Sequence, residues 1–413
     1  MLYGMHDASQ FMAAPLRLMA EAAQEIFRSP FHPLSYTTLG RSIAAGAEVI
    51  ESVLTQRQKP EWGLDTTTLA DGRTVPVTVE IATSRPFCDL LHFKRDLGGE
   101  TLGEPTLLLV APLSGHHATL LRGTVQELIK THEVYVTDWR DARLVPVEEG
   151  PFGVDSYIGY LIDFIRFLAG DEMQRIHTMA VCQPAPLLLS ATALMASWHD
   201  PAVPKSMTLM GGPIDTRVNP TIVTTAAENR PVEWFKRNCI TTVPAYYPGA
   251  GREVYPGFLQ IRAFMAMNPA RHVGAHLKMF DHLVKGDGDS AEAHRKFYDE
   301  YLAVLDATSE YYLETVDTVF KQHALPRGKM IWNNDGVDPE AITDTALFTV
   351  EGELDDISAP GQTYAAQTIC DRIPSEKRAH LLQTGVGHYG IFNGRRWREQ
   401  IAPRIADFIR TNA

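Results

Sequence analysis

The first 60 residues carry apolar positions at helical spacing, with polar residues between them. The recurring apolar residues are Phe11, Met12, Leu16, Met19, Ala23, Ile26 and Phe27. This pattern predicts an amphipathic helical segment over residues 1–70 that packs on a larger domain. An alternative interpretation is an amphipathic patch that meets another protein or an apolar surface.

From about residue 75 the pattern changes to short β-branched and apolar runs, which predict strands. The first two runs, at 75–83 and 88–96, are close enough to form a strand pair. The later runs are TLLLVAP (106–112), EVYVTDW (133–139), HTMAVC (177–182), KSMTLMG (205–211), TALFTVEG (345–352) and AHLLQTG (379–385). Long segments separate these later runs, so we expect parallel strands joined by right-handed helical crossovers. The chain then closes with an amphipathic helix, WREQIAPRIADFIRTN.

Residues 216–330 differ from the rest because they are rich in aromatic residues and helix formers and contain no convincing strand. An all-helical insertion between two late strands of a parallel sheet is the arrangement expected of a lid over the carboxyl edge of the sheet. The predicted organisation is therefore a helical segment at 1–70, an α/β core at 71–215 and 331–413, and a helical lid at 216–330.

Composition narrows the classes of partner. The 413 residues include 38 Lys and Arg against 50 Asp and Glu, a formal charge of −12, which argues against a nucleic-acid-binding surface. The four cysteines are far apart and form no metal-ligand pattern, which fits a reducing cytoplasm. The N-terminus lacks the basic region of a signal peptide, and no apolar run is long enough to span a membrane. We therefore expect a cytoplasmic protein with no membrane span and an uncharged or small partner.

The strongest chemical signal follows the run HTMAVC. An apolar strand ends at Cys182, and a helix of small and apolar residues follows at once. Such a strand–nucleophile–helix turn places the side chain at the carboxyl edge of the sheet and at the positive end of a helix. The segment departs from the G-x-S-x-G pattern, since Ala180 and Pro184 replace both glycines and sulfur replaces the hydroxyl. Cys182 is the predicted nucleophile, against the alternative of an inert core cysteine.

Two later strands each end in a loop that offers a partner for Cys182. Asp355 follows the strand TALFTV, and His388 follows the strand AHLLQ in a Gly-flanked loop. The order nucleophile, acid, histidine matches the α/β-hydrolase fold, in which His388 acts as base and Asp355 orients it. Asp356 is the fallback for the acid. This order predicts an α/β-hydrolase with a mostly parallel sheet and a helical lid.

The transition state of acyl transfer also needs backbone N–H donors. We expect Gln183 to supply one and the loop after TLLLVAP to supply the other, with Leu113 preferred and Ser114 next. The neighbouring His116 and His117 lack a third ligand, so the sequence predicts no metal site and the chemistry requires no cofactor.

Taken together, the segments VAPLSGHHATLLRGTV, VCQPA, EGELDD and GVGHYG resemble those of the intracellular poly(3-hydroxybutyrate) depolymerases. The resemblance extends over nearly the whole chain, and the polyhydroxyalkanoate synthases are similar more distantly. It implies a cytoplasmic, granule-associated enzyme that releases 3-hydroxybutyrate oligomers or monomers from native polyester granules. It also implies Cys182 as nucleophile, Asp355 as acid and His388 as base.

Aromatic residues of the lid and of one strand end are candidates to line the acyl-binding site. These substrate-binding candidates are Trp139, Tyr246, Tyr247 and Phe258, with Trp234, Phe235, Tyr255 and Phe264 also in the lid. Packing within the lid is the competing interpretation for these aromatic residues, and a structural Asp–Arg pair beside Trp139 is an alternative at that strand end.

Two other functions remain open. The first is an acyltransferase of the same fold, which would use coenzyme A or extend a polyester. The second is a non-catalytic granule-associated protein. The sequence is also compatible with a homo-oligomer.

Overall fold

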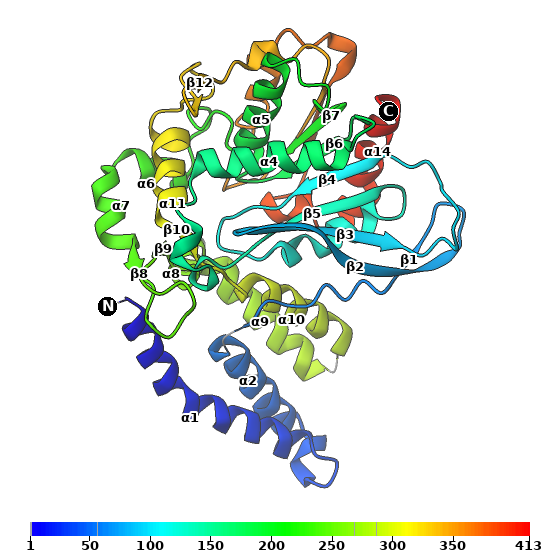
Figure 1. Ribbon diagram of the computed structural model, residues 1–413. Helices are drawn as coiled ribbons and strands as arrows, with labels where there is room; N and C mark the ends of the chain where they lie inside the picture. The colour runs from blue at the N-terminus through cyan, green and yellow to red at the C-terminus, as the bar shows by residue number, and fades with distance from the viewer. Residues whose placement is uncertain (1, 56, 268, 286) are drawn as a thin grey trace.

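The computed structural model describes residues 2–55, 57–267, 269–285 and 287–413. A nine-stranded sheet in the order β1-β2-β3-β5-β4-β6-β7-β13-β14 forms the core (Figure 1). Its strands are β1 (Thr66–Thr68), β2 (Thr74–Arg85), β3 (Cys88–Arg95), β4 (Thr106–Val110), β5 (Glu133–Trp139), β6 (His177–Val181), β7 (Ser206–Met210), β13 (Ala346–Gly352) and β14 (Arg378–Gln383). Every predicted strand is present.

The sheet has an antiparallel and a parallel part. β2 pairs antiparallel with β1 and β3, and β3 pairs antiparallel with β5. From β5 onward all neighbouring strands are parallel, as the long connections between them predict. Strands β6, β7 and β13 are buried along their whole length, which is typical of parallel strands covered on both faces.

Helices cover both faces of the sheet. α4 (Val154–Ala169) packs against α5 (Ala185–Ser197) on one face, and α3 (Arg122–Leu128) packs against α14 (Ala402–Thr411) on the other (Figure 1). Two short helices, α12 (Ala365–Ile369) and α13 (Gly394–Arg396), and the β11–β12 hairpin (Ile331–Trp332 and Asp335–Gly336) complete the core. This strand order, with crossover helices on both sides, is the α/β-hydrolase fold.

The segment between β7 and β13 is the one predicted to form a lid. Its helices are α6 (Ile222–Glu228), α7 (Val232–Cys239), α8 (Gly257–Met267), α9 (Pro269–Lys285), α10 (Gly288–Leu302) and α11 (Ser309–Thr315), followed by the π-helical turn η5 (Val316–Lys321). The prediction of an all-helical lid is wrong in one respect. A small antiparallel sheet of β8 (Thr241–Thr242), β9 (Glu253–Tyr255) and β10 (Ala307–Thr308) joins the chain before α8 to the chain after α10. Strands of two or three residues are too short to leave a pattern of alternation.

The N-terminal segment forms a helical hairpin of α1 (Leu2–Arg28) and α2 (Thr38–Leu54). α1 packs on α2, and α2 packs on α9 of the lid (Figure 1). The predicted boundary at residue 70 is too late, because residues 66–68 pair with β2 and belong to the sheet. Among the helices that the structure describes, none combines the length and apolar character of a membrane span.

Candidate active site

Cys182 occupies a sharp turn between β6 and α5. Its backbone has φ +68°, a left-handed conformation that is rare for residues other than glycine. Two hydrogen bonds hold this turn: the Cys182 N–H donates to Met210 O at 2.7 Å, and the Ala185 N–H donates to Cys182 O at 3.1 Å. The side chain is half-buried and lines a cavity under the lid. This geometry is that of a nucleophile elbow.

The room that this turn needs comes from glycines on the next strand, which the sequence analysis missed. A Cβ on Gly212 would lie 2.1 Å from Ala185 Cβ and 2.9 Å from Cys182 O. Gly211 has φ +54°, and a Cβ there would lie 2.6 Å from Ile391 Cδ1 and 3.3 Å from His388 Cε1. In the sequence, the Gly-Gly pair directly after the run KSMTLM was the sign that the chain is crowded at this point. The glycines that this turn needs therefore come from the two residues that follow β7, and the turn's own segment supplies alanines.

His388 and Asp355 form a buried pair beside Cys182. His388 Nδ1 lies 2.7 Å from Asp355 Oδ2, and both side chains are almost fully buried. Burial lowers the pKa of His388, but the charges of Asp355 and Cys182 and hydrogen bonds to both outweigh it, so this pKa lies well above its usual value. The imidazole ring therefore connects the Cys182 sulfur to the Asp355 carboxylate.

Asp355, and not Asp356, is placed to orient the histidine. Asp355 Oδ1 accepts hydrogen bonds from the N–H groups of Ile357 and Ser358, each at 2.9 Å, while Oδ2 faces His388. Asp356 is exposed to solvent. Both oxygens of Asp355 are thus held by the fold, which leaves the carboxylate one orientation.

The acid loop and the histidine loop are joined directly to each other. The Leu354 N–H donates to Val386 O at 2.9 Å, and a Cβ on Gly352 would lie 2.8 Å from the same oxygen. Below them, the buried carboxylate of Glu351 accepts hydrogen bonds from three backbone N–H groups of residues 361–364. The Leu354–Val386 hydrogen bond thus joins the two loops, and the Glu351 carboxylate holds the chain that follows the Asp355 loop.

Gln183, Leu113 and Ser114 lie around the same cavity as Cys182. Within the described part of the chain, the backbone N–H groups of Gln183 and Leu113 donate to no other residue. The loop that carries Leu113 is held from the lid, where the Leu305 N–H donates to Gly115 O at 2.8 Å. Two free N–H donors beside a nucleophile are what an oxyanion hole requires.

Trp139 does not line the cavity, so its predicted role in substrate binding is wrong. The side chain is 2% exposed and stacks on Tyr157 with ring centroids 4.1 Å apart. Trp139 Nε1 and Tyr157 Oη both donate to Ala111 O, at 2.8 and 3.1 Å. The indole N–H of Trp139 is therefore satisfied by a backbone carbonyl in the core. The Trp139 and Tyr157 side chains together hold Ala111, at the start of the loop that carries Leu113.

The cavity has a volume of about 470 Å³ and lies between the strand ends and the lid. Its aromatic lining consists of Phe235, Tyr255, Phe264, Tyr311, Tyr312 and Phe320. Most of its remaining lid-side lining is aliphatic, and Gln260 and Thr315 are the polar exceptions. Three of the aromatic residues were candidates from the sequence. Tyr311, Tyr312 and Phe320 were missed, although they recur at helical spacing in a segment recognised as lid.

Tyr246, Tyr247 and Phe258 are not part of this lining, so their predicted contact with substrate is wrong. Tyr246 is exposed and donates to Asp7 Oδ2 at 2.6 Å. Tyr247 and Phe258 pack around Tyr3 of α1. These side chains bind the N-terminal helix to the lid, a contact between segments that lie far apart in the sequence and that no local pattern could reveal.

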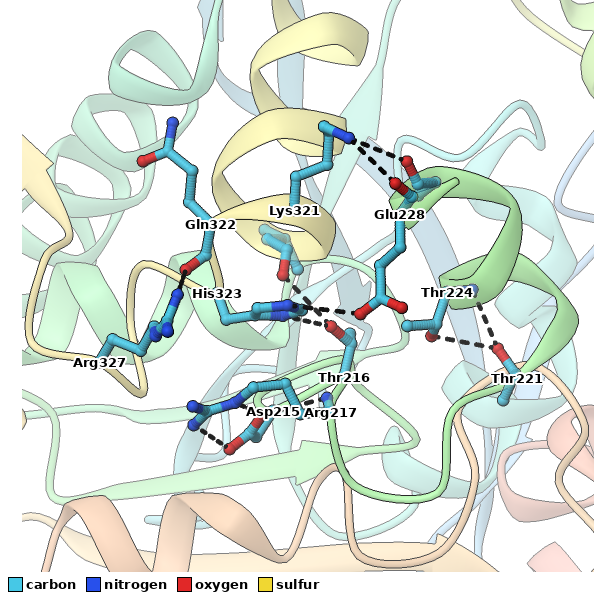
Figure 2. A network of polar contacts seen from close by, with 12 residues as sticks. Asp215, Thr216, Arg217, Thr221, Thr224, Glu228, Lys321, Gln322, His323 and Arg327 are labelled. Atoms are coloured by element: carbon cyan, nitrogen blue, oxygen red, sulfur yellow. Dashed lines mark hydrogen bonds and ion pairs between the residues drawn. The ribbon is translucent and has the colours of Figure 1, made fainter. Parts of the chain in front are cut away.

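A polar network ties two walls of the cavity together (Figure 2). Lys321 Nζ, at the end of η5, donates to the carbonyl oxygens of Ala227 and Arg230 at 3.2 and 2.7 Å, at the carboxyl end of α6. His323 Nδ1 lies 2.9 Å from Thr216 Oγ1, and His323 Nε2 lies 3.5 Å from Glu228 Oε1. The network holds α6 against η5 on the side away from the apolar lining.

His116 and His117 are both buried, and burial lowers the pKa of His116 to about 4 and that of His117 to about 3. In the ranges that the structure describes, no group of three His, Cys, Asp or Glu side chains could hold a metal ion. The His116 ring packs against the rings of Phe264 and Tyr301.

Three comparisons with known proteins show what the chain is similar to. Residues 211–413 match the family model described as PHB de-polymerase C-terminus, a range that includes Asp355 and His388 but not Cys182. The comparison with curated proteins gave no match. Similar solved structures include a 2-hydroxy-6-oxo-6-phenylhexa-2,4-dienoate hydrolase from Rhodococcus sp. strain RHA1, with 14% identity over 81% of this chain and 99% of that chain and a TM-score of 0.44. Another is the Paleococcus ferrophilus monoacylglycerol lipase, with 12% identity over 75% and 97% of the two chains and a TM-score of 0.42. The part of the chain from residue 211 onward is thus similar in sequence to PHB de-polymerases, which supports an ester hydrolase.

Proposed function

We propose that the chain is a depolymerase that hydrolyses the ester bonds of poly(3-hydroxybutyrate) through a Cys182–His388–Asp355 triad. One observation carries this proposal: Cys182 has left-handed backbone geometry at a strand–helix turn, opens onto an apolar cavity and contacts the buried His388–Asp355 pair. A backbone strained at this residue is typical of a functional position.

In the first half of the reaction, the Cys182 sulfur attacks the ester carbonyl carbon and His388 holds the thiol proton. The carbonyl oxygen becomes negative and accepts hydrogen bonds from the Gln183 and Leu113 N–H groups. When the C–O bond breaks, His388 Nε2 gives the proton to the leaving alcohol. The products are a thioester on Cys182 and a chain end with a free hydroxyl group.

In the second half, water replaces the alcohol. His388 Nε2 accepts a proton from water, the hydroxide oxygen attacks the thioester carbonyl carbon, and the C–S bond breaks as the proton returns to sulfur. Asp355 keeps Nδ1 protonated and stabilises the imidazolium in both halves. The cycle releases one carboxylic acid and one alcohol and uses no cofactor.

The cavity supports a neutral, apolar acyl chain. Its volume of about 470 Å³ lies within the range of small-molecule sites, roughly 300–1,000 Å³, so it accommodates a short segment of polymer and not a large domain of it. Aromatic and aliphatic side chains of the lid fit the methyl and methylene groups of a polyester. With a formal charge of −12, the chain repels anionic polymers but not an uncharged one.

Product analysis tests this function. Purified protein is incubated with amorphous poly(3-hydroxybutyrate) granules and with defined 3-hydroxybutyrate oligomers, with and without coenzyme A. We expect 3-hydroxybutyrate oligomers or monomers in both cases, and no release from the Cys182→Ala variant with its fold intact. Full activity in Cys182→Ala would overturn the proposal.

The same experiment separates the alternatives. If acyl–coenzyme A forms in the presence of coenzyme A and no product is released in its absence, the protein is an acyltransferase. Granule binding without any product would identify a non-catalytic granule protein. Release that does not depend on coenzyme A supports hydrolysis.

A further inference from the structure

Helix α1 turns its large apolar side chains to solvent. Seven of them are exposed, by 49 to 81%: Met5, Phe11, Met12, Leu16, Leu18, Met19 and Ile26. Its buried residue in the middle is Ala20, which together with the half-buried Ala13 lies on the side that meets α2. A helical hairpin normally buries its large apolar residues inside, so this one presents an unpartnered face.

Helix α2 shows the same arrangement. It buries small residues, including Ala44, Ala45 and Ala47, while Leu39, Ile50 and Val53 are 62, 43 and 54% exposed. Figure 1 shows α1 as the outermost element, with α2 between it and α9 of the lid. Within the described chain, the exposed face of α1 has no other element packed on it.

The first turn of α1 is nevertheless firmly attached. Tyr3 is buried and its hydroxyl donates to Asp306, and the His6 ring stacks on Phe258 with centroids 4.2 Å apart. The direction of the helix relative to the rest of the molecule is therefore set, and a partner meets a preformed face.

We propose that this face, formed by Met5, Met12, Met19, Ile26 and their apolar neighbours on α1, is a dimer interface that packs against the same face of a second copy of the chain. The four named residues recur at every seventh position, the repeat with which one helix packs along another. A surface that repeats on both copies is self-complementary about a two-fold axis.

The size and charge of the face fit this partner. A helix of 27 residues is about 40 Å long and about 10 Å across. The α1 face alone therefore covers roughly 400 Å², about half of the ~800 Å² per partner of a standard interface, and the apolar residues exposed on α2 add to the exposed apolar surface of the hairpin. Asp7, Glu21 and Glu25 of α1 are exposed, and its two cationic residues, Arg17 and Arg28, pair with Glu21 and with Glu48 of α2, so the helix has no basic face for an anionic membrane. The uncharged face of α1 in one copy is complementary to the same uncharged face in a second copy.

Sedimentation velocity of the full chain over a range of micromolar concentrations tests the interface. We expect twice the mass of one chain for the wild type. In Met12→Glu/Met19→Glu, two carboxylates would be buried in an apolar interface, so the dissociation constant should rise by about 100-fold or more. The matched control is Phe167→Glu/Ile331→Glu, which places two charges at residues that are 49 and 60% exposed elsewhere, and it should remain dimeric.

A second measurement keeps the test decisive if the double variant does not fold. Met19→Cys should give a covalent dimer with a short thiol-specific cross-linker, above the background of the wild type, which has four cysteines of its own. A wild type that keeps the mass of one chain at every concentration would overturn the proposal, and so would a dimer unaffected by Met12→Glu/Met19→Glu. A single chain that uses these residues to bind a polyester emulsion would assign the face to the polymer instead of a second copy.

Discussion

The two sides of the catalytic cavity are built in different ways. On the sheet side, each reactive group sits directly after a strand and is held by backbone hydrogen bonds, as in the turn at Cys182 and in the loop of Asp355. On the lid side, the lining is apolar, and polar contacts such as those of Lys321 lie behind it.

This difference separates two tasks. Backbone hydrogen bonds leave the reactive groups little freedom, which is what catalysis requires of them. Apolar side chains can be exchanged at small cost if their volume is kept, so the lid can set which acyl chain is accepted. Substitutions on the sheet side should therefore affect turnover of every ester, and those on the lid side should affect the choice among esters.

The largest expected effect comes from the histidine. In His388→Ala no group remains to take the thiol proton or to return it to the leaving alcohol. We expect kcat for a soluble 3-hydroxybutyrate ester to fall by about 1,000-fold or more, with a similar KM. Steady-state kinetics on short and long esters measure this, and a loss confined to long esters would break the separation of the two sides.

The second prediction concerns the crowded elbow. Gly212→Ala places a Cβ 2.1 Å from Ala185 Cβ, so the turn must shift. We expect a destabilisation of about 1–3 kcal/mol and a fall in kcat of about 100-fold. Adding Ala185→Gly removes one of the two close contacts and should restore part of both. The control Gly336→Ala, where a Cβ meets nothing within 4 Å, should change neither, and equal effects in both variants would contradict the role of Gly212.

The sheet side was largely predictable from the sequence. Parallel strands end at one edge, so Cys182, Asp355 and His388 could be brought together from their positions after three strands. The glycines at 211 and 212 were missed because they support the elbow across a strand pairing, and local sequence shows no such neighbour.

For the lid side, the sequence predicted the presence and position of a helical segment but not the residues that face the cavity. Its location between β7 and β13 followed from composition, but which aromatic residues face the cavity depends on how short helices pack. Tyr246 and Phe258 contact α1 instead. Tyr311 and Tyr312 line the cavity. The prediction for Trp139 was wrong for another reason: its indole N–H donates to Ala111 O, which keeps the side chain in the core.

The third prediction uses pH. The negative charge of Asp355 helps to hold the pKa of His388 above its usual value. In Asp355→Asn this pKa falls, so less imidazolium faces the Cys182 sulfur at neutral pH. We expect alkylation of Cys182 by iodoacetamide at pH 7 to slow by about 10-fold.

The pH profile of alkylation provides the check. As pH rises from 6 to 8, His388 should keep its charge in the wild type and lose it in Asp355→Asn, because the raised pKa of the wild type keeps His388 charged to higher pH. The alkylation rate of the wild type relative to that of Asp355→Asn should therefore increase over this range. The exposed Asp356 supplies the matched control, and Asp356→Asn should behave like the wild type. Equal profiles for Asp355→Asn and the wild type would show that the Asp355 carboxylate does not raise the pKa of His388.

The smallest effect is expected on the lid side. Ala226 of α6 lines the cavity, so Ala226→Phe should shorten the space for the acyl chain. We expect turnover of a monomer ester to change by less than about 3-fold, while kcat/KM for a longer oligomer falls by about 10-fold or more. Thr225→Phe, at an exposed position of the same helix, is the control. Equal losses on both substrates would show that the lid also positions the reactive groups.

The identity of the nucleophile decides the whole account, and the acyl-enzyme reports it directly. Protein mixed rapidly with a reactive 3-hydroxybutyrate ester, quenched in acid and digested should contain one acyl group as a thioester on the peptide with Cys182. Ser114 and Ser358 also line the cavity, and they are the serine hydroxyl groups to examine as alternative nucleophiles. Mass spectrometry should find the acyl group on Cys182, labile to hydroxylamine at neutral pH. An acyl group on Ser114 or Ser358, or turnover that persists in Cys182→Ala, would contradict the central claim.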